Sequence, residues 1–375
     1  MNKSFLFNSE IIKYNFKETK DMRFKWATTV LQLFAVLNNI CNIVNVDVIQ
    51  QVTAQSYPFN TVALTKGSTK IVTKKELEQE QNNFNSFGSK TFKNESFLLL
   101  GQKPEPNTNS EYKVSIEWVT VVVGGHERKV IGVNGEWPIP AVYAYYGKQL
   151  RLHVTNNLEL ETVLHSHGLY QNGTQYYDGT FGVNQCGIPP GANFTYDIPV
   201  QQTGTYYIHG HFDGQVNDGL RWPLVLLENG ISCTTDTDCL TDGEQEKNAL
   251  TICDRRKDLN RCASEWSRQY DEEVVVTLGD WYHDIHRPLL NWFLSDKNPT
   301  GKEPIPDLGL IMGSGDNPDI VIEPGKTYLF RVIAQSVLSR FNFFIEGHDM
   351  YVVEVDGIRT EPLLQRNLYI ASAQR

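Results

Sequence analysis

The chain has 375 residues and a formal net charge of −10, because 44 Asp and Glu outnumber 34 Lys and Arg. This acidic balance argues against nucleic acid as a partner, since phosphate binding needs clustered basic side chains. Hydrophobic residues make up 40% of the chain and aromatic residues 11%. That composition provides enough apolar material for two or three domains and favours β-structure.

Residues 1–54 are typical of a leader that directs secretion. A short basic stretch, MRFK, precedes an apolar run from Trp26 to Leu37. The run has the length of a signal-peptide core and is too short to span a membrane. Residues 1–21 are unusual for a signal peptide, and a translation start at Met22 would account for them. The alternative is a buried apolar helix.

Beyond the apolar run, three N-glycosylation sequons support export; they begin at Asn94, Asn172 and Asn193. No later apolar run reaches the roughly 18 residues of a membrane-spanning helix. We therefore expect a secreted or cell-surface protein on the extracellular side of the plasma membrane. Residues 55–111 are polar, with stretches such as KKELEQEQNNFNSFGSK, and we expect them to form a poorly ordered lead-in.

Short β-rich segments bounded by Gly, Pro or Asn fill residues 112–229, among them VSIEWVTVVV, KQLRLHVTNN and GTYYIHGH. This spacing predicts an all-β domain, an antiparallel sandwich or barrel. Residues 269–375 repeat the rhythm, and EPGKTYLFRV echoes YYGKQLRLHV. The final segment, LYIASAQR, predicts a strand that runs to Arg375. The second domain would then lack strands that it needs to close its sheets, as in a fragment or a broken gene model.

A cysteine-rich insertion occupies residues 230–268. In a secreted protein its four cysteines predict two disulfides, with three pairings open. A zinc site is the alternative, but the stretch has no Cys-x-x-Cys pair and no nearby His. Cys186 has no evident partner. The four cysteines are Cys233, Cys239, Cys253 and Cys262.

Four of the nine histidines form two His-x-His pairs, His165 with His167 and His209 with His211. Residues i and i+2 of a β-strand share a face, so two neighbouring strands would bring four imidazoles together. Such a cluster predicts a metal site for copper, zinc, iron or nickel. The alternative is that the histidines are incidental to a secreted adhesion module.

The phrases VNGEWPIPAVYAYYGKQLRLHVTNNL, HSHGLYQNGT and GTYYIHGH resemble the first cupredoxin domain of multicopper oxidases. GDWYHD, TYLFRV and IEGHDMYVVEVDGI are similar to their second domain. The phrase NPTGKEPIP is most similar to fungal iron-uptake ferroxidases. The resemblance covers roughly 220 residues, outside the leader and the insertion. It implies cupredoxin-like β-sandwich domains, the second one incomplete.

The resemblance also implies a mechanism, in which a trinuclear copper cluster reduces dioxygen to water with electrons taken from Fe(II). His165 matches a type 2 copper ligand, and His167, His209 and His211 match type 3 ligands. Asp178 matches a carboxylate that assists proton delivery, although Asp-Gly is also a turn signal. Glu303 matches a carboxylate that binds Fe²⁺, although it is also a plausible loop residue before Pro304. An iron permease is the partner that such a ferroxidase implies.

The sequence departs from the family pattern in several places. Ser166 stands where the family usually has Trp, and Gly210 where it usually has Ser. No His-x-x-His-x-His or His-Cys-His sequence follows His211, so the type 1 copper site is absent and we expect this chain alone to be inactive. A laccase-like phenol oxidase and a non-catalytic copper-binding fragment remain the alternatives. The five other histidines are interpreted as structural or exposed: His126, His153, His283, His286 and His348.

Overall fold

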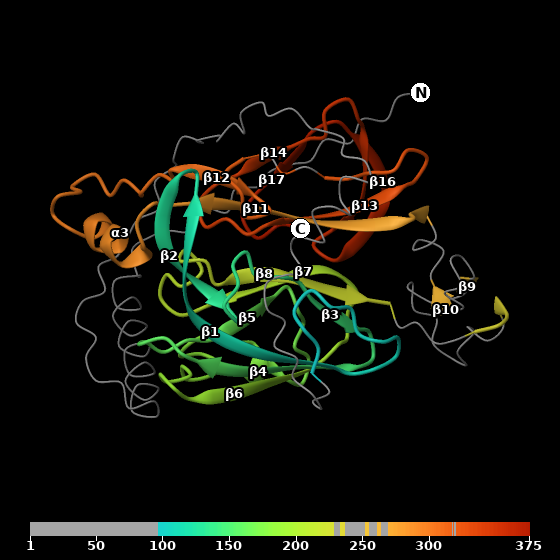
Figure 1. Cartoon of the computed structure of the whole chain (residues 1–375), viewed down its shortest axis with the longest axis horizontal. Helices are drawn as coiled ribbons and strands as arrows, with labels where there is room; N and C mark the ends of the chain where they lie inside the picture. The colour runs from blue at the N-terminus through green and yellow to red at the C-terminus, as the bar shows by residue number, and fades with distance from the viewer. Residues whose placement is uncertain are drawn as a thin grey trace, which may run out of the picture. The chain divides into compact units, whose positions relative to one another are not determined.

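The computed structural model describes residues 97–228, 233–236, 252–254, 261–263, 269–316, 318 and 320–375 (Figure 1). All of them belong to one compact unit, residues 56–375. The predictions for the leader, for the Asn94 sequon and for the lead-in up to residue 96 lie outside the described residues. Within the described ranges, no helix is both long enough and apolar enough to cross a membrane.

Two four-stranded sheets form the first domain. The first sheet contains, in spatial order, β2 (His126–Val133), β1 (Ser110–Val123), β4 (Gln149–Asn156) and β6 (Asn193–Pro199). The second sheet contains β3 (Val142–Tyr145), β8 (Arg221–Leu227), β7 (Gly204–Gly210) and β5 (Leu164–His167). A short 3₁₀ helix, η1 (Gln175–Tyr177), lies between β5 and β6.

Both sheets are mixed, which corrects the expectation of an antiparallel sandwich. β1 pairs with β4 in parallel, and so does β3 with β8, whereas the other pairs are antiparallel. Alternation predicts that a segment is a strand but carries no information on its direction, because both kinds of ladder share the two-residue side-chain period.

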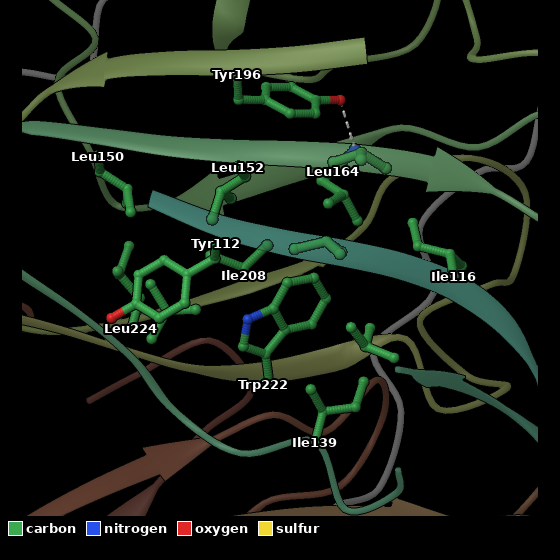
Figure 2. Packing of buried hydrophobic residues seen from close by; sticks show 14 of the residues in the cluster. Tyr112, Ile116, Ile139, Leu150, Leu152, Leu164, Tyr196, Ile208, Trp222 and Leu224 are labelled. Atoms are coloured by element: carbon green, nitrogen blue, oxygen red, sulfur yellow. Dashed lines mark hydrogen bonds between the residues drawn. The ribbon is translucent and has the colours of Figure 1, made fainter. Parts of the chain in front are cut away.

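The core of the first domain lies between its two sheets and holds β5 in place (Figure 2). Trp222 of β8 and Tyr112 of β1 are fully buried there. Tyr196 of β6 is also buried, and its hydroxyl oxygen accepts a hydrogen bond from the backbone N–H of Leu164 over 2.9 Å. This contact joins the sheets at the start of β5, next to His165.

The second domain is built around β11 (Glu272–Trp281), which pairs in parallel with β13 (Tyr328–Ala334) and antiparallel with β12 (Leu308–Ile311). Two further pairs complete it. They are β14 (Phe341–Phe343) with β17 (Leu368–Ile370) and β15 (Met350–Val355) with β16 (Ile358–Gln365). A small core around Val276, Leu278 and Phe341 supports these strands.

Two features of the second domain differ from the sequence prediction. The expected strand to Arg375 is shorter, because β17 ends at Ile370 and a turn follows, in which Ala373 has φ of 69°. A helix, α3 (His286–Phe293), follows β11 and was not predicted. Its eight residues include Pro288, and they are too few to give a clear helical periodicity.

The insertion contains a short hairpin of β9 (Ile252–Asp254) and β10 (Arg261–Ala263). Cys233 and Cys253 form a disulfide, and Cys262 is also disulfide-bonded. Cys186 is disulfide-bonded as well, so the expectation that it stands alone is wrong. Spacing along the sequence does not reveal a partner that folding brings close.

Candidate metal centre

β5 and β7 place the two His-x-His pairs beside each other. The strands are antiparallel neighbours, and their register sets His165 directly opposite His209. Alternation turns Ser166 and Ile208 into the protein interior, where both are buried, and leaves the histidine rings on the other face. His211 follows the last residue of β7.

The four rings converge, as their spacing predicts. The ring centroid of His165 lies 5.4 Å from that of His167, 5.3 Å from that of His209 and 5.3 Å from that of His211. One ligand nitrogen from each of His165, His167 and His209 lies within 4.8 Å of the other two. His211 completes the group, with its ring 5.7 Å from that of His209.

Backbone carbonyl groups fix which nitrogen two of these rings present. The Nδ1 atom of His165 lies 2.6 Å from the carbonyl oxygen of Asp178, and that of His209 lies 3.0 Å from the carbonyl oxygen of Gly210. Because a carbonyl oxygen only accepts, each Nδ1 carries the hydrogen and each Nε2 keeps its lone pair. His167 turns its Nδ1 atom toward Nε2 of His209, 3.3 Å away. These nitrogen atoms suit a metal ion that several imidazoles share.

Burial keeps two of the rings neutral. It lowers the pKa of His209 to about 3, with the Gly210 carbonyl opposing the shift. It also lowers the pKa of His167 to about 4, helped by the charges of His165 and Arg375. Neutral imidazole is the form that binds metal ions, so both side chains are in the protonation state that metal binding needs at neutral pH.

Asp178 lies beside His165, as its sequence match predicts. Its carboxylate Oδ1 is 3.3 Å from Nδ1 of His165. The next residue, Gly179, has φ of +78°, and a Cβ there would lie 1.8 Å from the carbonyl oxygen of Leu164. Glycine therefore allows the Asp178 turn to approach β5 closely, so a place in a turn does not keep the Asp178 carboxylate away from His165.

Tyr207 is a member of the site that sequence reasoning missed. Its ring stacks on His167 at 4.8 Å and on His209 at 5.0 Å, with an interplanar angle of 23° in each case. Burial raises its pKa to about 12, so the phenol stays protonated. The signal was available, because residues 207 and 209 share a strand face.

The two residues that depart from the family pattern, Ser166 and Gly210, both lie away from the face of the rings. A Cβ on Gly210 would lie 2.8 Å from Cδ2 of Leu220 and 3.1 Å from Cβ of Gln215, so these side chains occupy the space that a serine there would need. Ser166 is 2% exposed and lies on the core side of β5. Neither residue is on the face that carries the rings.

Glu303 lies apart from the histidines, in the second domain, on the loop between α3 and β12. Asn298 holds this loop, since its Oδ1 accepts from the backbone N–H of Lys302 over 3.0 Å. Glu303 is exposed and, with Asp280, contributes to the raised pKa of Tyr282, for which burial is the largest cause.

The five histidines interpreted as structural or exposed have contacts elsewhere. His126 stacks on His283, His153 contacts Thr195 and Glu111, His286 contacts Asp213 and Asp218, and His348 contacts the Glu346 carbonyl.

Two cupredoxin-like β-domains with a histidine cluster on one sheet place the chain among cupredoxin-fold metal proteins. Residues 115–229 and residues 272–375 each match a family model described as multicopper oxidase. The chain belongs to the multicopper oxidase family.

The similar curated proteins are fungal. The iron transport multicopper oxidase FET3 of Gibberella zeae is 41% identical over 74% of this chain and 40% of its own length. The iron transport multicopper oxidase fetC of Epichloe festucae is 40% identical over 67% of this chain and 35% of its own length. The chain therefore spans about two fifths of the relatives that it matches.

Solved structures agree with these relatives. Fet3p, described as a multicopper oxidase that functions in iron import, superposes with a TM-score of 0.58 and 32% identity. The match covers 71% of this chain and 44% of Fet3p. A laccase from Botrytis aclada gives a TM-score of 0.55 and 29% identity, over 73% of this chain and 46% of the laccase.

Proposed function

We propose that this chain supplies the histidines of one half of the copper cluster in a ferroxidase, which oxidises Fe(II) and reduces dioxygen to water. The convergence of four imidazoles from β5 and β7 is the observation that carries the proposal. The similarity to iron transport multicopper oxidases supports iron as the substrate.

The residues present fit copper. His165 would hold the type 2 ion, and His167, His209 and His211 would hold type 3 ions. Bound copper supplies one-electron redox chemistry, and imidazole ligands suit both of its oxidation states. The carbonyl groups of Asp178 and Gly210 orient two of the rings. The Asp178 carboxylate would hold and pass a proton at the cluster, and its distance of 3.3 Å from Nδ1 of His165 supports this role.

Glu303 is proposed as the Fe(II) ligand. Its carboxylate is exposed on a loop held by Asn298, and carboxylate oxygens are hard donors that favour Fe³⁺ over Fe²⁺. Iron bound there would lose an electron more readily. Phenolic substrates are the alternative, as in the laccase of similar fold.

Export to the cell surface is part of the proposal. Cys186, Cys233, Cys253 and Cys262 are all disulfide-bonded, which is typical of oxidising compartments. Asn172 and Asn193, the two sequons within the described residues, are both exposed. An iron permease that accepts the product Fe(III) is the partner that this role requires.

Metal titration of the purified chain tests the proposal. We expect copper to bind, and we expect His165→Ala and His209→Ala to abolish this binding, whereas His348→Ala, at an exposed ring, keeps it. We expect no blue absorption and no oxygen uptake, because these 375 residues contain no His-Cys-His sequence. Unchanged copper binding in both histidine variants would overturn the assignment. Unchanged Fe(II) binding in Glu303→Ala would favour phenols over iron.

A further inference from the structure

The loop that follows His211, residues 212–220, is fixed to the first domain from one side. The backbone N–H of His211 donates to the carbonyl oxygen of Val163 over 3.1 Å. Nε2 of Gln215 donates to the carbonyl oxygen of Glu161 over 2.8 Å, and its Oε1 accepts from the hydroxyl of Thr162 over 2.7 Å. The loop is thereby tied to the segment that leads into β5.

A histidine of the second domain holds the same loop from the other side. Nδ1 of His286 lies 2.5 Å from Oδ2 of Asp218, and Nε2 lies 3.0 Å from Oδ2 of Asp213. The backbone N–H of His286 also donates to Oδ1 of Asp218 over 2.8 Å. The ring packs so tightly on the loop that a Cβ on Gly214 would lie 2.4 Å from its Cγ.

The charged groups around His286 are complementary to one another. Both nitrogens of the ring face carboxylates. Burial lowers the pKa of His286, but the hydrogen bonds that the ring donates to Asp218 and Asp213, together with the charges of these carboxylates, outweigh it, and the pKa is raised. Arg128 lies 3.4 Å from Asp218, and Arg287 pairs with Asp213. The two carboxylates are therefore satisfied by cations from both domains, and His286 is the group that joins them.

We propose that His286 is a positioning residue for the metal centre. Through it the second domain holds the 212–220 loop and so sets the orientation of the His211 ring. Asp213 lies two residues after His211, and Leu220 and Gln215 pack where a Cβ on Gly210 would lie. A shift of the loop would therefore move His211 relative to the other three rings. The expected effect on copper binding rests on the proposed function, whereas the contact between His286 and the 212–220 loop does not.

A metal-free measurement tests the hold on the loop. In amide hydrogen exchange of the intact chain, we expect His286→Ala to speed exchange across residues 211–220 at least tenfold. The control is Arg359→Ala, which breaks the pair between Arg359 of β16 and Glu228 after β8, another contact between the domains. We expect this control to leave residues 211–220 unchanged. Equal exchange in His286→Ala and the parent chain would overturn the proposal.

Copper binding then tests the effect on the metal centre. We expect His286→Ala to weaken Cu²⁺ binding about tenfold, as the loss of supporting partners typically does, and to change the hyperfine splitting in electron paramagnetic resonance. His286→Gln keeps a side-chain donor and should restore part of both, which also covers poor folding of the alanine variant. An unchanged spectrum and affinity in both variants would contradict the positioning role. Absence of copper binding by the parent chain would instead overturn the proposed function, with the exchange result still standing.

Discussion

At the scale of single residues, the site depends on a few positions where backbone conformation or packing restricts which residue can stand there. Asp178 reaches His165 only because Gly179 follows it with φ of +78° and no side chain. The packing of buried Tyr207 against the rings of His167 and His209 is a second constraint. These residues shape the surroundings of the histidine rings.

Gly179→Ala should destabilise the chain by roughly 1–3 kcal/mol or more, because it combines left-handed strain with a clash against the Leu164 carbonyl. Gly173→Ala is the matched control. Gly173 also has φ of +78°, but a Cβ added there would have no atom within 4 Å. Urea unfolding of both variants measures the loss of stability in each, and the difference between them is the contribution of the clash. Equal losses in the two variants would show that the turn does not need close approach to β5.

At the scale of elements, the sequence predicts most of what positions the four histidine rings. Short segments rich in β-branched, aromatic and other apolar residues, bounded by turn residues, predict β4, β7, β8 and β11, and the His-x-His spacing predicts that the rings share a face. The direction of β1 relative to β4 was out of reach because it depends on contacts distant in sequence, and α3 was missed because eight residues are too few to give a clear helical periodicity. Thr205 of β7 shows this, since it is held by Glu354 and Arg331 of the second domain.

An ion pair between β11 and β13 predicts how the stability of the chain depends on pH. Glu273 of β11 contacts Arg331 of β13 at 3.2 Å. Burial raises the pKa of Glu273, but the charges of Arg331 and Lys103 outweigh it and lower the pKa from 4.5 to about 2. A lowered pKa in the folded state means that the stabilisation is present above about pH 4.5 and is lost as the pH falls toward 2. At neutral pH it amounts to about 3 kcal/mol.

Glu273→Gln should therefore lower the free energy of unfolding by about 3 kcal/mol at pH 7, with a difference from the parent that shrinks below pH 4.5. Glu323→Gln is the control, because Glu323 forms an exposed pair with Lys326, and such pairs contribute about 1 kcal/mol at most. Chemical unfolding between pH 7 and pH 3 provides the measurement. A difference that does not depend on pH would mean that the charge of Glu273 is not what stabilises the strand pair.

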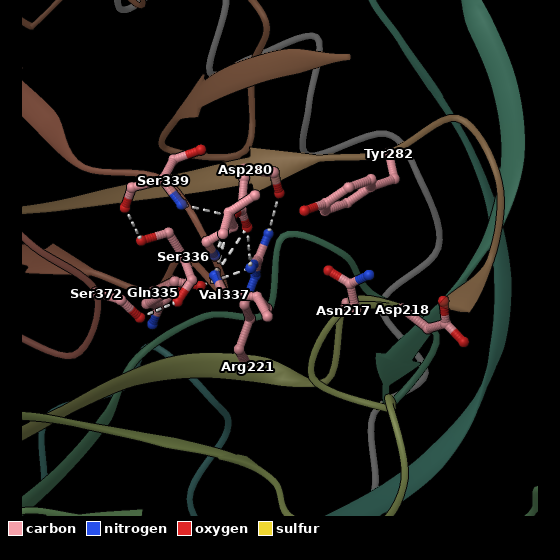
Figure 3. Close-up of polar contacts among 12 residues, drawn as sticks. Asn217, Asp218, Arg221, Asp280, Tyr282, Gln335, Ser336, Val337, Ser339 and Ser372 are labelled. Atoms are coloured by element: carbon pink, nitrogen blue, oxygen red, sulfur yellow. Dashed lines mark hydrogen bonds and ion pairs between the residues drawn. The ribbon is translucent and has the colours of Figure 1, made fainter. Parts of the chain in front are cut away.

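At the scale of the whole described molecule, a buried ion pair joins the two domains (Figure 3). Arg221 of β8 lies 3.4 Å from the carboxylate of Asp280 on β11, and their side chains are 5% and 0% exposed. Asp280 also accepts from the backbone N–H groups of Val337, Leu338 and Ser339, over 2.7 to 3.1 Å. One carboxylate thus organises a loop of the second domain and a strand of the first. Sequence alone gave no sign of this pair, because its partners are 59 positions apart.

Removal of one partner from such a pair leaves a buried charge without compensation, which typically costs 3–5 kcal/mol. Asp280→Asn should cost about 3 kcal/mol, since its amide oxygen still accepts from part of the loop. Because this pair joins β8 of the first domain to β11 of the second, its loss should also uncouple the unfolding of the two domains. We expect tryptophan fluorescence and circular dichroism to follow one unfolding transition in the parent and two separate transitions in the variant.

Asp349→Asn is the control, because Asp349 lies in an exposed pair with Arg366, and this variant should keep a single transition. A single transition in Asp280→Asn as well would mean that apolar contacts such as Trp281 with Val130 hold the domains together without the ion pair.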